Sequence, residues 1–410
     1  MKADFQPVLI GSDNTIYGLA RSFHMAYGKK SIVFCREATK AINGSKIIEQ
    51  IIAEPRLMDE TIFVQKLNQF ADNWYQKTPG TRLILVNPAS DVYAELVSKT
   101  QVKLAEKFDM NVPKWEIYQK VTDKVEFYKL CEKHGLDYPK FVTVNKDNYK
   151  KTPNNITFPA VIKPVDSAEY WKLPRFDGYQ KVYFVDNQVE AFEILGKVFR
   201  SGYHGTMIIQ EKIESDITGQ QDITTYSGKK SKKVEFSQLF QAVLADNNPL
   251  SFGVFCALLP TKNPQLEAKI AKFLDSIGYQ GFAGINIMID PRDGRPKLLE
   301  LNARLHGESF ALTAMGNNPA QILVSDIHSG IFKKTNNEIL WKSVPDCVIR
   351  KFVTDERLRT KVKKLIREGK TDTELNYKPD LSPRRRIDYL LFVTRRWRNF
   401  NKFTRQSADK

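Results

Sequence analysis

Residues 281–309 read GFAGINIMIDPRDGRPKLLELNARLHGES, and this stretch carries the densest group of structural signals in the chain. Two short apolar runs, 283–289 and 297–301, flank the turn-forming residues Asp290 to Gly294. Strand-like runs on either side of a proline and an Asp-Gly pair are typical of a β-hairpin. The stretch therefore predicts two antiparallel strands.

The second of these strands carries three polar residues at alternate positions, Glu300, Asn302 and Arg304. Alternate residues of a strand point to the same face of a sheet. A carboxylate and an amide supply the oxygen ligands that Mg²⁺ prefers, and a guanidinium pairs well with phosphoryl oxygens. The triplet suits a magnesium-bound polyphosphate, but a solvent-facing surface strand has the same pattern.

Three further landmarks precede the hairpin. The first is an amphipathic helix expected over 123–134, which ends at Gly135. The second is the apolar strand Pro159–Pro164, which contains Lys163. The third is the apolar strand 206–210, which runs into the acidic stretch 211–216. With Glu-x-Asn-x-Arg after the hairpin, this order resembles the ATP-grasp ligases. The resemblance rests on four landmarks in sequence, so it is far more specific than any one of them.

The resemblance implies an ATP-grasp fold, in which two α+β lobes enclose ATP, preceded by a Rossmann-like α/β domain. The expected limits are 1–119 for the Rossmann-like domain, 120–205 for the small lobe, 206–340 for the large lobe with the metal site, and 341–410 for a basic C-terminal extension. In the first domain we expect strands at 7–11, 31–34 and 82–86, and a helix at 14–27. Ser12, Asp13 and Asn14 suit the cap of that helix better than a substrate contact.

The resemblance also implies roles for individual residues. Glu300, Asn302 and Asn286 would bind Mg²⁺, and Lys163 and Arg304 would act on the transferred phosphoryl group. ATP would be held by Lys124, Lys163, Ser167, Glu211, Lys212, Ile213 and Asp216, with the main chain of Glu211 and Ile213 at the adenine and Asp216 at the ribose.

The chain departs from the general family pattern at several places. Asn286 stands where an acidic metal ligand is usual, and a glycine-rich flap is replaced by the pattern Lys-Pro-x-x-Ser-x-Glu-Tyr-Trp after residue 162. That pattern resembles the D-aspartate ligase branch of the family, whereas Ala303 and residues 305–308 depart from it. His306 fits either a proton acceptor for an attacking amine or a structural histidine.

The activity implied is that of an ATP-dependent carboxylate-amine ligase, which forms an amide through an acyl phosphate and releases ADP. The substrates expected from the D-aspartate ligase branch are D-aspartate, or a related amino acid, and the lysine of a peptidoglycan peptide precursor such as a UDP-linked muramyl peptide. The alternatives are a ligase of another small acid and amine, or a catalytically impaired ATP-binding regulatory protein.

Composition restricts the partners and the cellular location that we expect for the protein. The formal net charge of +16 indicates an anionic partner, and the chain lacks the spacing of zinc fingers or RNA-recognition motifs, so no nucleic acid is expected. The start of the sequence has no signal-peptide pattern and no run is long enough for a membrane span, which predicts a cytoplasmic protein. The four cysteines are widely spaced, and we expect reduced core residues.

The last thirty residues, 381–410, hold nine basic and two acidic side chains, a formal +7. Leu390, Val393, Trp397 and Phe400 recur at helical spacing and predict one apolar helix face. A basic helix with Trp and Phe on its apolar side suits the surface of an anionic membrane. Docking on the protein core explains the pattern equally well, so peripheral contact with the inner face of the membrane stays open.

Overall fold

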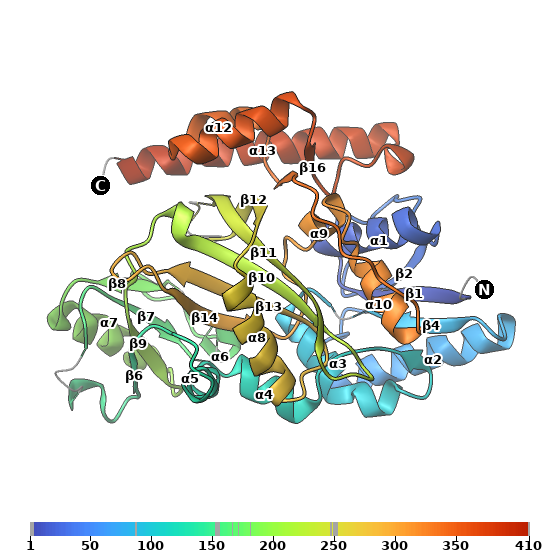
Figure 1. Ribbon diagram of the computed structural model, residues 1–410. Helices are drawn as coiled ribbons and strands as arrows, with labels where there is room; N and C mark the ends of the chain where they lie inside the picture. The colour runs from blue at the N-terminus through green and yellow to red at the C-terminus, as the bar shows by residue number, and fades with distance from the viewer. Residues whose placement is uncertain are drawn as a thin grey trace.

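The computed structural model describes residues 4–86, 88–151, 156–165, 167–170, 172–180, 182–246, 248 and 253–408, without the side chains of 167, 168 and 403–408. Its strands form three sheets (Figure 1). The expected ATP-grasp arrangement, a parallel sheet domain followed by antiparallel lobes, is confirmed. The limits of the domains remain predictions.

The N-terminal sheet is parallel and five-stranded. In spatial order its strands are β3 (Ile48–Ala53), β2 (Ser31–Cys35), β1 (Phe5–Ile10), β4 (Arg82–Leu85) and β5 (Phe108–Asp109), and its helices are α1 (Asn14–Tyr27), α2 (Glu60–Lys77) and α3 (Asp91–Leu104). Asp13 caps α1, because its Oδ1 accepts hydrogen bonds from the backbone N–H groups of Thr15 and Ile16, both at 3.0 Å. The capping role expected for Asp13 is confirmed.

The small lobe is built on a four-stranded antiparallel sheet. In spatial order its strands are β6 (Phe141–Val144), β9 (Met207–Glu211), β7 (Ala160–Pro164) and β8 (Tyr183–Val185), and the neighbouring helical segments are α4 (Trp115–Thr122), α5 (Lys124–Lys133), η1 (Tyr149–Lys151), α6 (Ser167–Tyr170) and α7 (Gln188–Arg200). α5 begins after its cap Asp123 and is followed by Gly135 at φ 63°, as predicted.

The large lobe contains a seven-stranded sheet whose first strands include the predicted hairpin. In spatial order they are β14 (Pro296–Asn302), β13 (Gly281–Ile289), β10 (Gln220–Ser227), β11 (Val234–Ala245), β12 (Phe255–Thr261), β15 (Leu340–Lys342) and β16 (Thr371–Asp372). On one face, Ile223, Ile285 and Leu301 pack into a core with α4, α5 and α8 (Pro264–Ser276). The opposite face carries the polar residues of the hairpin.

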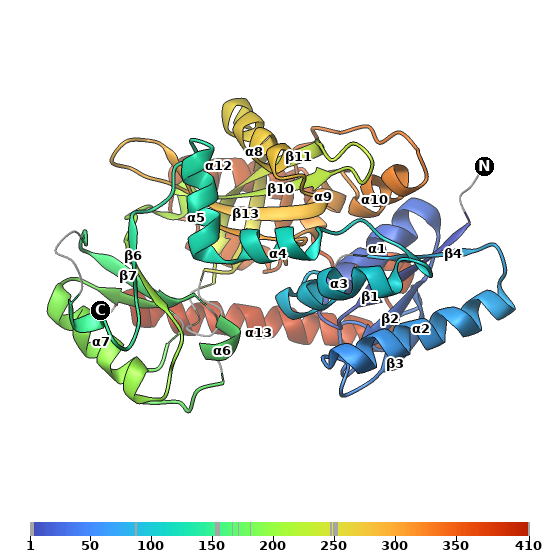
Figure 2. The ribbon, with the colours of Figure 1, turned by 90° about the horizontal axis from the view of Figure 1, so that it is seen from below.

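The C-terminal part lies against both the large sheet and the N-terminal domain. Its helical segments are α9 (Phe310–Ala314), α10 (Pro319–Ile327), α11 (Asp346–Phe352), α12 (Glu356–Arg367), η3 (Lys378–Asp380) and α13 (Pro383–Ala408). Figure 2 shows α13 crossing the molecule from the N-terminal domain toward the side of the small lobe. None of the helices in the described ranges is long and apolar enough to cross a bilayer.

Two expectations about side chains need correction. The apolar residues predicted to share one face of the last helix are not covered alike, because Phe400 is buried at 2% exposure while Leu390 and Trp397 are exposed. Cysteines 35, 131 and 256 are buried and free, as expected for core residues, but Cys347 is exposed on α11. A helix at the edge of the core buries only one of its faces, and the sequence around Cys347 does not show on which face this residue lies.

Candidate active site

The polar face of the large sheet brings three strands together. Glu300 on β14 pairs in register with Asn286 on β13, which pairs with Asp222 on β10. Residues paired directly across antiparallel strands point to the same face, so these three side chains form one row. In the adjacent row, Asn302 stands opposite Gly284. Glu300, Asn302 and Asn286 are thus brought together as predicted.

Asn302 lies at the centre of this face. Its Nδ2 donates to Asn286 Oδ1 at 3.2 Å, and its Oδ1 accepts from Arg304 Nη2 at 3.1 Å. Glu300 is partly exposed on the same face. One carboxylate and two amide oxygens are hard ligands at neighbouring register positions, so this donor set fits Mg²⁺.

A buried cluster that the sequence analysis did not identify supports Asn302 from behind. His306 is 4% exposed, with its Nδ1 at 2.5 Å from Asp222 Oδ1 and its Nε2 at 3.1 Å from Asn302 Nδ2. Burial acts to lower the pKa of His306, but the charge of Asp222 outweighs it and the pKa is raised. Burial and the charge of Asp222 also raise the pKa of Glu308, to about 7.

Gly284 makes room for the imidazole. A Cβ atom at this position would lie 2.1 Å from His306 Nε2. The buried Asp222 in the strand sequence QQDITTYS was the available signal for this cluster, because an unpaired carboxylate rarely occupies a buried strand. Its partner could not be identified from the sequence, since the contact depends on the pairing of strands.

Arg304 connects this polar face to the N-terminal domain. Its Nε lies 2.5 Å from Asp91 Oδ1 on α3, and its Nη1 donates to the carbonyl of Leu305 at 3.1 Å. Burial alone would lower the pKa of Arg304, but Asp91 raises it. The guanidinium is therefore held at the junction of the two domains and beside Asn302.

The expected phosphate-binding residues lie on the small lobe. Lys163 is on β7, where it pairs in register with Ile208 of β9. Lys124, the first residue of α5, donates from Nζ to the carbonyl of Val165 at 3.3 Å, which places it beside the end of β7. Ser167 begins α6, but its side chain lies outside the described part of the structure.

The segment expected to bind adenine and ribose, residues 211–216, is called the hinge and begins at the last residue of β9. The backbone N–H of Glu211 donates to the carbonyl of Lys140 at 2.9 Å, so this group is engaged within the small lobe. Lys212 pairs through Nζ with Glu214 Oε1 at 3.3 Å, and Ile213 is buried. Asp216 is exposed and accepts from the backbone N–H of Thr218 at 2.8 Å, while the hydroxyl of Thr218 also donates to it and lowers its pKa.

The hinge is tied to the hairpin by buried charges that were also not predicted. Lys297 on β14 lies 3.0 Å from Glu211 Oε1 and 2.8 Å from Asp290 Oδ2. Arg292 adds a contact of 2.8 Å to Glu211 Oε2. The side chains of Glu211, Asp290 and Lys297 are at most 10% exposed, so this is an interior ion cluster between the lobes.

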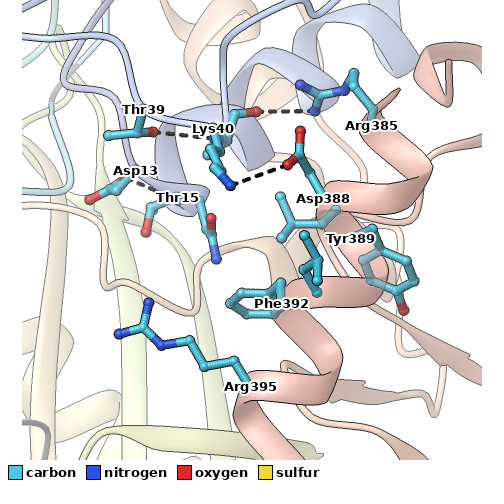
Figure 3. Close-up of a pocket in the computed structure, with 13 residues that line it drawn as sticks. Asp13, Thr15, Thr39, Lys40, Arg385, Asp388, Tyr389, Phe392 and Arg395 are labelled. Atoms are coloured by element: carbon cyan, nitrogen blue, oxygen red, sulfur yellow. Dashed lines mark hydrogen bonds and ion pairs between the residues drawn. The ribbon is translucent and has the colours of Figure 1, made fainter. Parts of the chain in front are cut away.

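A pocket of about 570 Å³ lies between the N-terminal end of α1 and α13. Figure 3 shows side chains from both helices around it, with Thr15 on one side and Phe392 and Arg395 on the other. Lys40 pairs with Asp388 across it at 3.6 Å. Thr15 Oγ1 donates to the carbonyl of Gly307 at 3.0 Å, so one wall of the pocket touches the loop that carries His306 and Glu308.

No protein-family model matches the chain. It is 29% identical over 394 residues to a D-aspartate ligase of Enterococcus faecium, a match that covers 93% of this chain and 92% of that protein. Among solved structures, it resembles an L-amino acid ligase of Bacillus licheniformis with a TM-score of 0.56, 16% identity and 80% and 75% of the two chains covered. It also resembles an ADP complex of N5-carboxyaminoimidazole ribonucleotide synthetase, with a TM-score of 0.60, 13% identity and 83% and 81% covered.

These comparisons agree with the three-sheet architecture. The sequence match spans nearly all of both chains, and the structural matches span about four fifths of this one. The chain has the ATP-grasp fold, and over nearly its whole length its sequence is similar to that of a ligase.

Proposed function

We propose that the protein joins an amino acid carboxylate to an amine at the expense of ATP. A carboxylate oxygen attacks the γ-phosphorus of ATP, which releases ADP and leaves an acyl phosphate. The amine nitrogen then attacks the acyl carbon, phosphate leaves, and the nitrogen loses a proton. The amino acid proposed is D-aspartate or a related one, and the amine is the lysine side chain of a peptidoglycan peptide precursor, such as a UDP-linked muramyl peptide. The match of 29% identity over 93% of the chain to a D-aspartate ligase supports this choice.

The observation that carries the proposal is the row of Glu300 and Asn286 with the adjacent Asn302 on one sheet face. These residues would hold Mg²⁺, which when bound neutralises charge on the phosphates. Lys163, on β7 of the small lobe, and Arg304, which follows β14 of the large lobe, would pair with phosphoryl oxygens of a nucleotide bound between the two lobes. Lys124 and Ser167 would hold the phosphates, Glu211, Lys212 and Ile213 the adenine, and Asp216 the ribose.

His306 has a positioning role in this proposal. Asp222 fixes the Nδ1 side of the imidazole, and the Nε2 side meets the amide of Asn302. A ligand held by a buried partner keeps one orientation, which favours tight metal binding. The contact with Asn302 favours this role over the alternative of a proton acceptor for the amine.

The pocket between α1 and α13 is the place we propose for the amine-bearing substrate. Its wall reaches the loop 306–308 through Thr15, and Arg395 supplies a cation that suits an anionic peptide precursor. Phe392 and Tyr389 give it an apolar side. The N-terminal domain and α13 would thus select the acceptor, while the two lobes handle ATP.

The test is phosphate release from ATP and Mg²⁺ across L- and D-amino acids, with and without a UDP-linked muramyl pentapeptide. We expect release that depends on one acid and one amine, and an amide product by mass spectrometry. Glu300→Gln should lower turnover roughly 100-fold or more, because it removes the only carboxylate among the proposed metal ligands. Glu193→Gln, an exposed change on α7, is the matched control and should leave turnover unchanged.

The same assay tests the acceptor pocket. Arg395→Gln should raise the KM for the peptide several-fold and leave the KM for ATP unchanged, whereas Arg367→Gln on α12 should change neither. An equal effect of both variants would contradict the assignment of the pocket.

Asn286 favours a second candidate function. Because this residue brings no charge, the site binds metal less strongly than one with two carboxylates. If ATP binds with micromolar affinity and no pair of acid and amine drives turnover, the ligase proposal is wrong and a catalytically impaired ATP-binding regulatory protein takes its place.

A further inference from the structure

Helix α13 presents two different apolar faces. The inner face is defined by Arg385, Tyr389, Phe392, Arg396 and Phe400, which recur at helical spacing and contact the protein. Arg385 binds the carbonyls of Ala41 and Asn43, and Arg396 pairs with Asp246 at 2.8 Å. The helix is therefore fixed on the core by one side, and its other side faces away.

The outer face is defined by Ile387, Leu390, Leu391 and Trp397. These four side chains are between 45% and 59% exposed, although they are large and apolar. Leu390 and Leu391 lie three and four residues after Ile387, and Trp397 lies seven residues after Leu390. These spacings place the four side chains on one side of the helix. A stripe of four large apolar side chains on one element is a larger exposed feature than scattered single residues, and such patches mark interaction sites.

Arginines border this stripe. Arg384, Arg386 and Arg398 are all exposed on the same half of the helix. Asp388 is the one acid in the sequence of α13, and it points instead toward Lys40 at 3.6 Å. The outer face thus combines apolar side chains, an amphipathic Trp and positive charge.

We propose that the outer face of α13 binds the surface of an anionic lipid bilayer, with the helix axis parallel to the membrane. The apolar stripe enters the headgroup boundary, Trp397 lies at the interface, and the three arginines meet lipid phosphates. A second copy of this chain fits less well, because a symmetric contact would bring two sets of arginines together. A nucleic acid offers phosphates but no partner for the apolar stripe.

The orientation also places the acceptor pocket near the membrane. Leu391 belongs to the outer face and lines the pocket between α1 and α13. A bilayer on the outer face therefore lies beside the pocket. The membrane proposal itself does not depend on ligase activity, and its test uses no substrate.

The experiment is co-sedimentation of the full-length protein with vesicles. One set contains phosphatidylcholine with phosphatidylglycerol, and the other contains phosphatidylcholine alone. We expect binding to the anionic vesicles that weakens as salt is raised, and at least about tenfold weaker binding to the neutral ones.

Two sets of substitutions separate the contributions of the outer face. Ile387→Ser, Leu390→Ser and Trp397→Ser together should weaken binding at least about tenfold, and Arg384→Gln, Arg386→Gln and Arg398→Gln together should do the same and remove the salt dependence. The control is Lys363→Gln, Lys364→Gln and Arg367→Gln, which removes three exposed charges from α12. Thermal unfolding of each variant shows whether it is folded.

Four outcomes overturn the proposal. They are no binding to anionic vesicles, equal binding to both kinds of vesicle, equal weakening by the α12 control, and retention of binding by the folded apolar triple variant. Sedimentation velocity adds another: a dimer that the triple variant abolishes would assign the face to self-association. Preference for a duplex DNA over vesicles at the same salt would assign it to nucleic acid.

Discussion

At the scale of single residues, Gly284 controls the position of His306. Any Cβ at 284 overlaps the imidazole, so Gly284→Ala must push His306 away from Asp222 and Asn302. Because His306 holds a proposed metal ligand, we expect the Mg²⁺ concentration for half-maximal turnover to rise roughly tenfold. The dissociation constant of ATP measured without metal should change little. Turnover against Mg²⁺ and nucleotide binding by calorimetry check the two parts.

Gly307→Ala is the matched control, because among the described residues a Cβ there would come within 4 Å of Thr15 Oγ1 alone, at 3.9 Å. It should leave the Mg²⁺ dependence unchanged. If Gly284→Ala lowers the maximal rate but not the Mg²⁺ dependence, His306 does not position Asn302, and the proton-acceptor role becomes the better explanation.

At the scale of elements, Lys297 joins the hinge after β9 to the β13–β14 hairpin. Lys297→Met keeps the length of the side chain, but of the two cations that Glu211 and Asp290 share it leaves only Arg292. We expect a loss of about 2 kcal/mol in the free energy of unfolding at pH 7, because two buried carboxylates lose one shared cation. Lys129→Met is the control, since the exposed Lys129–Glu126 pair contributes little. Urea denaturation measures both.

The difference in the free energy of unfolding between wild type and Lys297→Met should be smaller at acidic pH. Burial acts to raise the pKa of Glu211, but hydrogen bonds from Lys140, Arg292 and Lys297 lower it, and hydrogen bonding to Arg292 lowers the pKa of Asp290. A carboxyl with a lowered pKa in the folded state stabilises the protein above its ordinary value, here 4.5 and 3.8, and loses this effect as pH falls further. The gap between wild type and Lys297→Met should therefore shrink below pH 4.5. A constant gap down to pH 3 would show that charge pairing is not the cause.

Some of the strands could be predicted from the sequence and others could not. The hairpin strands, expected at 283–289 and 297–301, lie at Gly281–Ile289 and Pro296–Asn302, because alternation and turn residues are local signals. β3 was not predicted, since it is an edge strand with mostly exposed or half-exposed residues and no clear apolar pattern. Asp222 and Lys297 could not be assigned to the site, because their contacts depend on strand register and on the approach of the lobes.

At the scale of the whole molecule, α13 ties the ends of the chain together. Arg385 pairs at 3.1 Å with Asp380, which is fully buried and also accepts a hydrogen bond from the hydroxyl of Tyr17 on α1 at 2.9 Å. Helical periodicity predicted an apolar face here but not its partner. The inner face could not be told from the outer one, because the choice depends on Asp380 and Asp246, which lie on other parts of the fold.

Removal of residues 383–410 should therefore destabilise the entire protein. It leaves Asp380 and Asp246 buried without their arginines and uncovers the core around Phe400. We expect the free energy of unfolding to fall by more than about 3 kcal/mol, since even one buried charge left without its partner costs that much. Urea denaturation of the truncated and full-length chains checks this, with the Ile387, Leu390 and Trp397 triple serine variant as the control that keeps the inner face. If the truncated chain is as stable as the full one, α13 is an appended helix. If only the truncation is destabilising, the helix is part of the core by its inner face and available to a membrane by its outer face.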